Sequence, residues 1–143
     1  MTLPNWNLKK FYVNIDDNKI SKDLKVLSKK SKNFSNDFRN KLGSLKASQL
    51  IDSLKDFEKI QEIIQKIQSF AYLSYCTNQL DEKNKKFYQQ VEEKISEIEK
   101  NLIFYGIELN KLSTKQLLPF KKTKYKNWIE NHRKFKRFQK SED

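Results

Sequence analysis

The chain has 143 residues, with 30 Lys and Arg against 18 Asp and Glu, and a formal net charge of +12. This length suits one domain that buries about 70% of its unfolded surface, and Leu, Ile, Val and Phe are frequent enough to exclude an intrinsically disordered chain. Only two Gly and two Pro occur, which favours long helices, and no apolar stretch approaches the roughly 18 residues of a membrane-spanning helix.

The first predicted elements are a lead-in over residues 6–12 and a helix over residues 17–41. The lead-in is expected to be extended or a single turn, packed by its aromatic side chains. Asp16 and Asp17 suit a helix N-terminus, where a carboxylate accepts hydrogen bonds from N–H groups that have no partner in the helix. Apolar residues then recur at helical spacing but skip one position at Ser31. They are Ile20, Leu24, Leu27, Phe34 and Phe38.

A second predicted helix covers residues 47–78. Gly43 is expected to end the preceding helix, because glycine adopts the left-handed conformation found at many helix C-termini. Apolar positions then continue at steps of three and four, and they widen near the end of the helix, which indicates burial on more than one side. Residues 78–81 form a polar break, and Asp81 is a suitable N-cap for the next helix.

A third predicted helix continues from this break to Leu112. Its apolar positions are nearly heptad-spaced: Phe87, Val91, Ile95, Ile98, Leu102, Tyr105, Leu109 and Leu112. Ser113 is expected to cap a brief turn and Pro119 to interrupt the chain. Tyr125, Trp128, Ile129, His132 and Phe135 then predict a final helix over residues 122–138.

These elements predict an all-α fold, a single domain over residues 1–143. Short connections favour an up-and-down bundle of about three long antiparallel helices plus shorter C-terminal helices. The heptad-like spacing of the third helix allows an alternative, in which Ile98 and Leu102 join two copies of the chain in a coiled coil.

Groups suited to catalysis or metal binding are few. Cys76 and His132 are the single cysteine and histidine, so a zinc site or a nucleophile with its base and a third orienting group has little support. We interpret His132 as a core or boundary residue and Cys76 as a small buried one. The carboxylates of Glu92, Glu93, Glu97 and Glu99 read as a salt-bridged solvent face. No catalytic, cofactor-binding or metal-binding residue is assigned.

The strong positive charge suggests a second function, the binding of nucleic acid or another anionic surface. Residues 121–140 hold nine basic residues against Glu130 alone, with Lys121, Lys124, Arg133 and Arg137 as the contacts that this function would need. The aromatic residues of this segment share one helical stripe, however, which favours a core face with a basic back. Only three of the 30 basic residues are Arg, so nucleic acid is the less favoured partner.

The expected localisation is the cytoplasm. The N-terminus lacks a basic segment followed by an apolar one, as a secretory signal would have. A lone cysteine suits a reducing compartment, because it can form no internal disulfide. No membrane partner is expected.

Four segments resemble those of oligoendopeptidase F proteins, relatives of thimet oligopeptidase. The first, residues 6–12 (W-N-L-K-K-F-Y) followed by Asp16 and Asp17, is similar to the family's W-D-L-x-x-L-Y opening. The second, residues 69–78 (S-F-A-Y-L-S-Y-C-T-N), resembles its S-Y-A-x-L-x-Y-x-x-D stretch. The third, residues 108–112 (E-L-N-K-L), resembles the end of its third long helix, and the fourth, residues 125–135, its aromatic, Arg-containing helix.

The four family-like segments follow the family's order over nearly the whole chain. Departures are Asn7 for Asp, Lys46 where the family often has a capping Ser, and a high Lys content. The resemblance implies that the parent protein is a zinc metalloendopeptidase that cuts short peptides, and that this chain is its N-terminal helical wall over the substrate channel. Oligopeptides and the parent's own C-terminal domain are the implied partners.

The zinc ligands implied by the resemblance belong to an H-E-x-x-H helix and a further Glu in that C-terminal domain, and no position of this chain matches them. Zinc would polarise the scissile carbonyl and activate a water there. Residues 140–143, a Lys and a Ser followed by two acidic residues, resemble the start of the family's next helix. We therefore expect the chain to be a truncated reading frame.

Overall fold

The computed structural model describes residues 7–134 and 136, and this part of the chain contains helices and no strands, which confirms the all-α prediction. None of its helices is both long and apolar enough to cross a membrane. In chain order the helices are η1 (Leu8–Lys10), α1 (Asn18–Phe38), η2 (Leu42–Ser44), α2 (Ala47–Thr77), α3 (Glu82–Glu99), α4 (Ile103–Lys111), α5 (Thr114–Leu117), η3 (Leu118–Lys122) and α6 (Lys126–Lys134).

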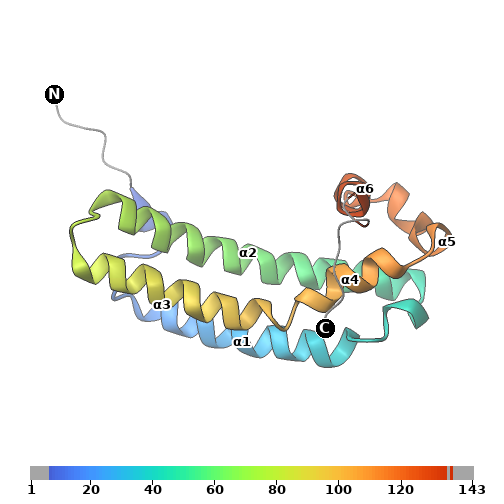
Figure 1. Ribbon diagram of the computed structural model, residues 1–143, viewed down its shortest axis with the longest axis horizontal. Coiled ribbons are helices and arrows are strands. Elements are labelled where there is room, and N and C mark those ends of the chain that lie inside the picture. Colours follow the sequence, from blue (N-terminus) through green and yellow to red (C-terminus); the bar gives the residue numbers. More distant parts are fainter. Residues whose placement is uncertain (1–6, 135, 137–143) are drawn as a thin grey trace.

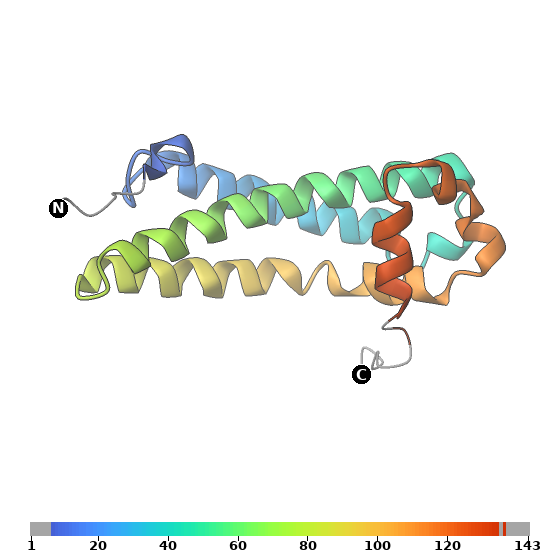
Figure 2. The same ribbon diagram turned by 90° about the horizontal axis from the view of Figure 1, so that it is seen from above.

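Helices α1, α2 and α3 lie side by side and form an elongated bundle (Figures 1 and 2). Helix α2 runs back along α1, and α3 returns along both, so the hairpin between α2 and α3 lies at one end of the molecule. Helix α4 continues onward from α3. The short helices α5, η3 and α6 lie at the opposite end, where α6 crosses over α2 and α4 (Figure 2).

Two groups of aromatic side chains hold the ends of the bundle. At the α4 end, the Phe34 ring lies 5.0 Å from Tyr105, 5.9 Å from Phe57 and 5.9 Å from Phe104, between ring centroids. The Tyr105 hydroxyl is 2.8 Å from Ser53 Oγ, and burial raises the pKa of Tyr105 well above its usual range. These rings join α1, α2 and α4 in one core. At the other end, Tyr12 packs on Phe70 of α2, and Phe70 packs on Phe87 of α3. The lead-in is therefore packed by an aromatic side chain, as predicted.

The predicted starts of the first three helices are confirmed. Asp17 and Asp81 are the N-caps of α1 and α3, and their side chains accept from Lys19 N at 2.9 Å and from Lys83 N at 2.8 Å. Lys46, the N-cap of α2, makes no side-chain cap hydrogen bond; its own N–H donates instead to Gln49 Oε1 at 3.0 Å.

The prediction that Gly43 takes the left-handed conformation after α1 is wrong. Asn40 takes it, with φ of 62°, and neither glycine has a positive φ. Asparagine tolerates this conformation better than other residues with a Cβ. The Glu108 carboxylate also accepts the N–H groups of Asn40 and Leu42. A side chain from α4 therefore holds the connection between α1 and α2.

The prediction of a single third helix that reaches Leu112 is also wrong. The chain turns over residues 100–102, and a separate helix, α4, begins at Ile103. Asn101 in this turn donates from Nδ2 to Ser31 Oγ at 3.3 Å. Ser31 is fully buried, so the position that the apolar stripe of α1 skips is the one that meets the turn. The apolar residues keep their helical spacing across this turn, so the spacing alone did not predict the turn.

The helix cap and the interrupting proline predicted for the C-terminal segment are confirmed. Ser113 caps α5, since its Oγ accepts from Gln116 N at 3.3 Å, and Pro119 lies at the start of η3. The predicted final helix over residues 122–138 begins later, at Lys126, because Thr123 is extended. Its predicted end, with Phe135, lies outside the described residues, as does Trp6 of the lead-in.

The left-handed Asn40 gives a test of the α1–α2 connection. Asn40→Ala is expected to lower the free energy of unfolding by about 1 kcal/mol, because alanine is strained in this conformation. Asn40→Gly is the matched control and should leave it unchanged or raise it. Urea unfolding followed by circular dichroism measures both. Equal losses in the two variants would mean that the Asn40 side chain, and not its backbone, is what matters.

Candidate functional site

Helix α6 forms a wall across the outer surface of the bundle. Its Trp128 ring lies 6.2 Å from that of Phe57 on α2 and stacks on His132 at 5.2 Å, between ring centroids. His132 Nε2 is 3.2 Å from the carbonyl oxygen of Gly106 on α4. A Cβ at residue 106 would lie 3.1 Å from the His132 ring, so glycine lets α6 come this close to α4.

A groove of about 580 Å³ lies between α2 and α6, which we call the α2–α6 groove. Its lining residues are Leu54, Phe57, Glu58, Gln61, Glu62, Gln65, Lys124, Tyr125 and Trp128. Lys124 Nζ lies 2.8 Å from both carboxylate oxygens of Glu58, and the Tyr125 hydroxyl donates to Glu58 Oε2 at 2.8 Å. The hydrogen bonds from Lys124, and then from Tyr125, lower the pKa of Glu58. These contacts fix the wall of the groove to α2.

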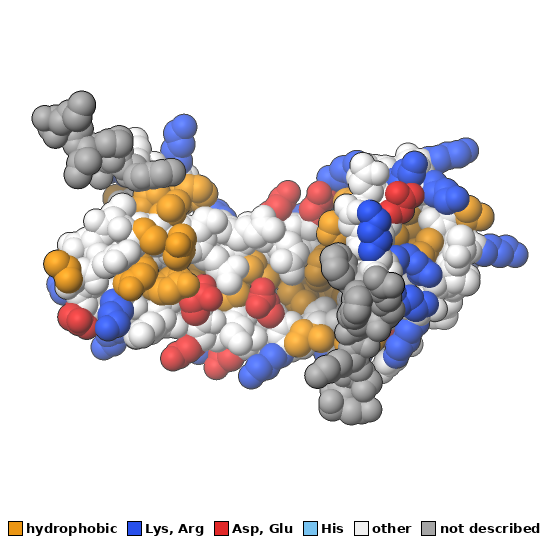
Figure 3. All heavy atoms as spheres, turned by 45° about the horizontal axis from the view of Figure 1, so that its top comes forward, with side chains coloured by type: hydrophobic (Ala, Val, Ile, Leu, Met, Phe, Trp, Pro, Cys, Tyr) orange, Lys and Arg blue, Asp and Glu red, His pale blue; other side chains and the backbone are white. Residues whose placement is uncertain are grey.

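From this groove a polar and aromatic surface continues toward the α2–α3 hairpin. This α2–α3 face consists of Gln61, Gln65, Gln68, Tyr72 and Tyr75 from α2 and Tyr88, Glu92 and Glu99 from α3. Gln68 Nε2 donates to Glu92 Oε1 at 3.5 Å and links the two helices. On the face seen in Figure 3, hydrophobic side chains gather near the hairpin end and again beside α6, with polar and acidic side chains between them.

Three tyrosines form the hairpin end of the α2–α3 face. Tyr75 stacks on Tyr88 at 5.4 Å, and Tyr72 lies 6.0 Å from Tyr88, between ring centroids. Tyr72 is 53% exposed, and Leu80 in the hairpin is 95% exposed.

The carboxylates of the α2–α3 face are not neutralised within the described part of the chain. Lys94 lies 3.3 Å from Glu97 on another side of α3, but no ion pair involves Glu62, Glu92 or Glu99 among these residues. Partial desolvation, and then the negative charge of Glu92, raises the pKa of Glu99. The predicted salt-bridged solvent face therefore holds for Glu97 and not for Glu92, Glu93 or Glu99.

The structure keeps Cys76 and His132 far apart. Cys76 is exposed near the hairpin end of α2, so its predicted burial is wrong: it lies on the outward side of the last turn. His132 packs beside Phe57 through Trp128, and the 19 residues of helix from Phe57 to Cys76 span roughly 28 Å. The two side chains cannot form a catalytic pair. The prediction of His132 as a boundary residue is confirmed by its half-buried ring.

No three His, Cys, Asp or Glu side chains in the described ranges 7–134 and 136 gather into a group that could hold a metal ion. The zinc that the family resemblance implies belongs to a C-terminal domain, and its ligands are not expected among these residues. No step of zinc chemistry is assigned to this chain.

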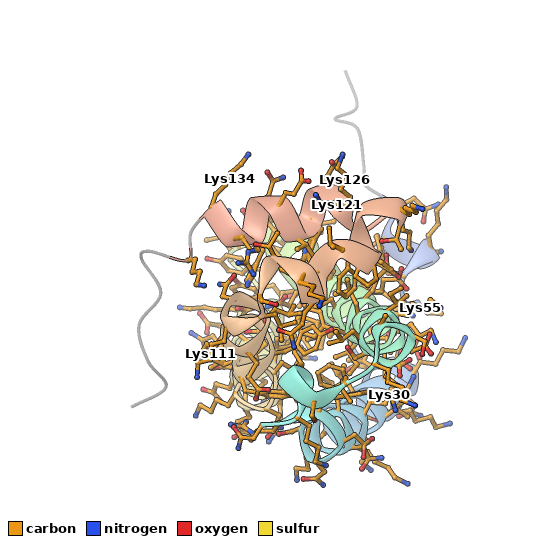
Figure 4. All side chains as sticks on the ribbon, turned by 90° about the vertical axis from the view of Figure 1, so that its right-hand side faces the viewer. Lys30, Lys55, Lys111, Lys121, Lys126 and Lys134 are labelled. Atoms are coloured by element: carbon orange, nitrogen blue, oxygen red, sulfur yellow. The ribbon has the colours of Figure 1, made fainter. Side chains whose placement is uncertain are left out.

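Of the basic residues predicted for an anionic partner, Lys121 and Arg133 line one pocket of about 260 Å³, which Lys126 and Glu130 also line. Lys124 binds Glu58, and Arg133 Nη1 donates to the carbonyl oxygen of Leu112 at 2.8 Å. Arg137 lies outside the described residues. In Figure 4, Lys121, Lys126 and Lys134 lie along the same side of this end of the molecule, whereas Lys30, Lys55 and Lys111 point in other directions. Tyr125 and Ile129 are buried as predicted, whereas Trp128 is 40% exposed.

No family model, curated protein or solved structure matches the chain. The resemblance to oligoendopeptidase F consequently stays a prediction that depends on the four family-like segments. The α2–α6 groove and the α2–α3 face were not predicted. Apolar spacing identified the core sides of α2 and α3, but it carried no signal of where α6 would cross.

The close contact between α4 and α6 predicts an unusual response at Gly106. Within a helix, Gly→Ala ordinarily stabilises by about 1 kcal/mol, but here the new Cβ meets His132. Gly106→Ala is expected to destabilise the wild-type protein and to stabilise the His132→Ala variant. Thermal unfolding of the four proteins in this cycle provides the measurement. Stabilisation by Gly106→Ala in both backgrounds would contradict the close packing of α6.

The raised pKa of Glu99 predicts a stability that falls as the pH rises. The folded protein holds the Glu99 proton more tightly than the unfolded chain, so ionised Glu99 destabilises the fold above its raised pKa, and this effect disappears below the usual Glu pKa of about 4.3. Glu99→Gln should therefore raise the melting temperature slightly at pH 7 and not at pH 4. Glu97→Gln is the matched control and should show no such gain, because Glu97 pairs with Lys94.

Proposed function

We propose that this chain is the N-terminal helical domain of an oligoendopeptidase F type zinc metalloendopeptidase, which hydrolyses short peptides. The observation that carries the proposal is that the family-like segments, far apart in sequence, contact one another in pairs. Tyr12 of the first packs edge-on against Phe70 of the second at 5.1 Å between ring centroids. Arg133 of the fourth donates to the carbonyl oxygen of Leu112 in the third.

Other residues of these segments have structural roles that support the same assignment. Tyr12 is buried, its hydroxyl donates to Asp23 Oδ2 at 2.7 Å, and Lys66 Nζ lies 4.4 Å from the ring centroid. Glu108 holds the α1–α2 connection. Such contacts give a physical reason for these residue types in segments one and three, because each joins two parts of the chain.

In this proposal the chain supplies a wall of the substrate channel and no catalytic group. The α2–α3 face and the α6 wall are its exposed, hollowed side, and they are the surfaces that would face the peptide and the catalytic domain. Zinc and its ligands would lie in the C-terminal domain of the parent. The exposed Cys76 thiol suits a reducing compartment, so the proposal places the protein in the cytoplasm.

The two rival functions have less support than the peptidase domain. The apolar stripe that motivated a dimer is used inside the chain, since Val91, Ile95, Ile98 and Leu102 are all buried in its core. For an anionic partner, Lys121 and Arg133 line one pocket, but Glu130 lines it as well, and Lys124 is already paired with Glu58.

The proposal is tested by sequencing the native transcript beyond Asp143 and expressing the in-frame protein. The expected outcome is an H-E-x-x-H helix and a purified protein that cleaves internally quenched oligopeptides. A chelator should abolish this cleavage and added zinc should restore it, whereas the 143-residue chain alone should cleave nothing. An immediate stop codon, or cleavage that survives chelation, would overturn the proposal.

A further inference from the structure

We propose that the α2–α6 groove and the α2–α3 face form one continuous surface that binds a short, extended peptide carrying a Lys or Arg side chain. The inference deepens the proposed function, since it names the substrate class that the domain would receive. It has its own test, because binding to this chain can be measured without zinc and without hydrolysis.

The dimensions of the surface suit a short peptide. The groove beside Trp128 has a volume of about 580 Å³, and Trp128 contacts Phe57 at the start of the surface. From Phe57 to Tyr72 the helix α2 advances roughly 22 Å at 1.5 Å per residue. An extended peptide covers this length with about six or seven residues.

The chemistry at the two ends suits apolar side chains. Trp128 is 40% exposed at the α6 end, and Tyr72 is 53% exposed at the hairpin end. Aromatic rings with an apolar face and a polar edge bind peptide side chains at low cost in conformational entropy, because each ring has only two rotatable bonds. Between the two ends, the amides of Gln61 and Gln65 can donate to and accept from a peptide backbone.

The charge between these ends selects a cation. Glu62 lines the groove, and Glu92 and Glu99 lie on the α3 side of the face. Lys124, the cation among the groove residues named above, is already bound by Glu58. None of these three carboxylates has an ion pair among the described residues, and Glu92 lies near enough to Glu99 for its negative charge to act on that carboxyl group. A ligand that brings its own positive charge relieves this repulsion.

The experiment uses Trp128 as a reporter. Trp6 and Trp128 are the two tryptophans of the chain, so a Trp6→Phe background leaves one fluorophore at the groove. The probe is a seven-residue peptide, acetylated and amidated at its ends, with a central Lys between Phe and Leu. Its controls carry norleucine or Glu in place of the Lys. Titration with the Lys peptide at low salt should change the fluorescence of Trp128. The norleucine peptide should bind at least tenfold more weakly, and the Glu peptide should show no binding.

A matched pair of double variants locates the site. The double variant Glu92→Gln, Glu99→Gln should bind the Lys peptide about tenfold more weakly, which corresponds to about 1.4 kcal/mol. The double variant Glu93→Gln, Glu97→Gln changes the net charge by the same amount on other sides of the same helix, and it should lower the affinity for the Lys peptide less than twofold. Circular dichroism checks that both proteins keep their helix content.

Several results would overturn the inference. Equal weakening by the two double variants would mean that the probe responds to overall charge. Equal affinity for the Lys and norleucine peptides would mean that the groove is an apolar site without charge selection. A dimer by light scattering that Trp128→Glu disperses would identify a second copy of the chain as the occupant. If the Lys peptide binds as described but the parent proves not to be a zinc peptidase, the binding site stands and the proposed function fails.

Discussion

The contact between Phe34 on α1 and Tyr105 on α4 is the constraint on which the rest of the structure depends. It draws α4 into the aromatic core beside Phe57, and a straight continuation of α3 would have carried that segment past it. The turn at residues 100–102, held by Asn101 on the buried Ser31, redirects the chain. Once α4 is in place, its other sides carry Glu108 to the α1–α2 connection and Gly106 to the surface that α6 crosses.

The functional side of the molecule follows from that placement. His132 can lie on α4 because residue 106 has no side chain, and this contact positions Trp128 above Phe57. Helix α6 thereby becomes a wall, and the outer sides of α2 and α3 become the floor in front of it. Tyr125 and Lys124 hold the wall to Glu58 on α2. The wall is thus held to α2 through Trp128, Lys124 and Tyr125 and to α4 through His132.

Two carboxylates of this surface interact with each other and not with a lysine. Some exposed carboxylates of the described chain, such as Asp52, Asp56 and Glu97, lie beside lysines three residues away, whereas others, such as Asp37 and Glu130, have no ion pair among the described residues. On the α2–α3 face, partial desolvation, and then the negative charge of Glu92, raises the pKa of Glu99. Unrelieved repulsion in a protein rich in lysine is a small loss of stability. Such losses commonly persist at surfaces that bind a ligand of opposite charge.

The sequence by itself determined the helical class, the starts of α1, α2 and α3, the caps at Asp17 and Asp81, and the sides of the helices that face the core. These features depend on contacts within a few residues, namely helix periodicity and hydrogen bonds to the first turn. Tertiary structure decided the turn at residues 100–102, the left-handed Asn40 in place of Gly43, the exposure of Cys76 and the crossing of α6. Each depends on partners that are distant in sequence, such as Ser31 for Asn101 and Gly106 for His132. Apolar spacing is unchanged whether or not those partners meet, so it could not reveal the groove that their meeting creates.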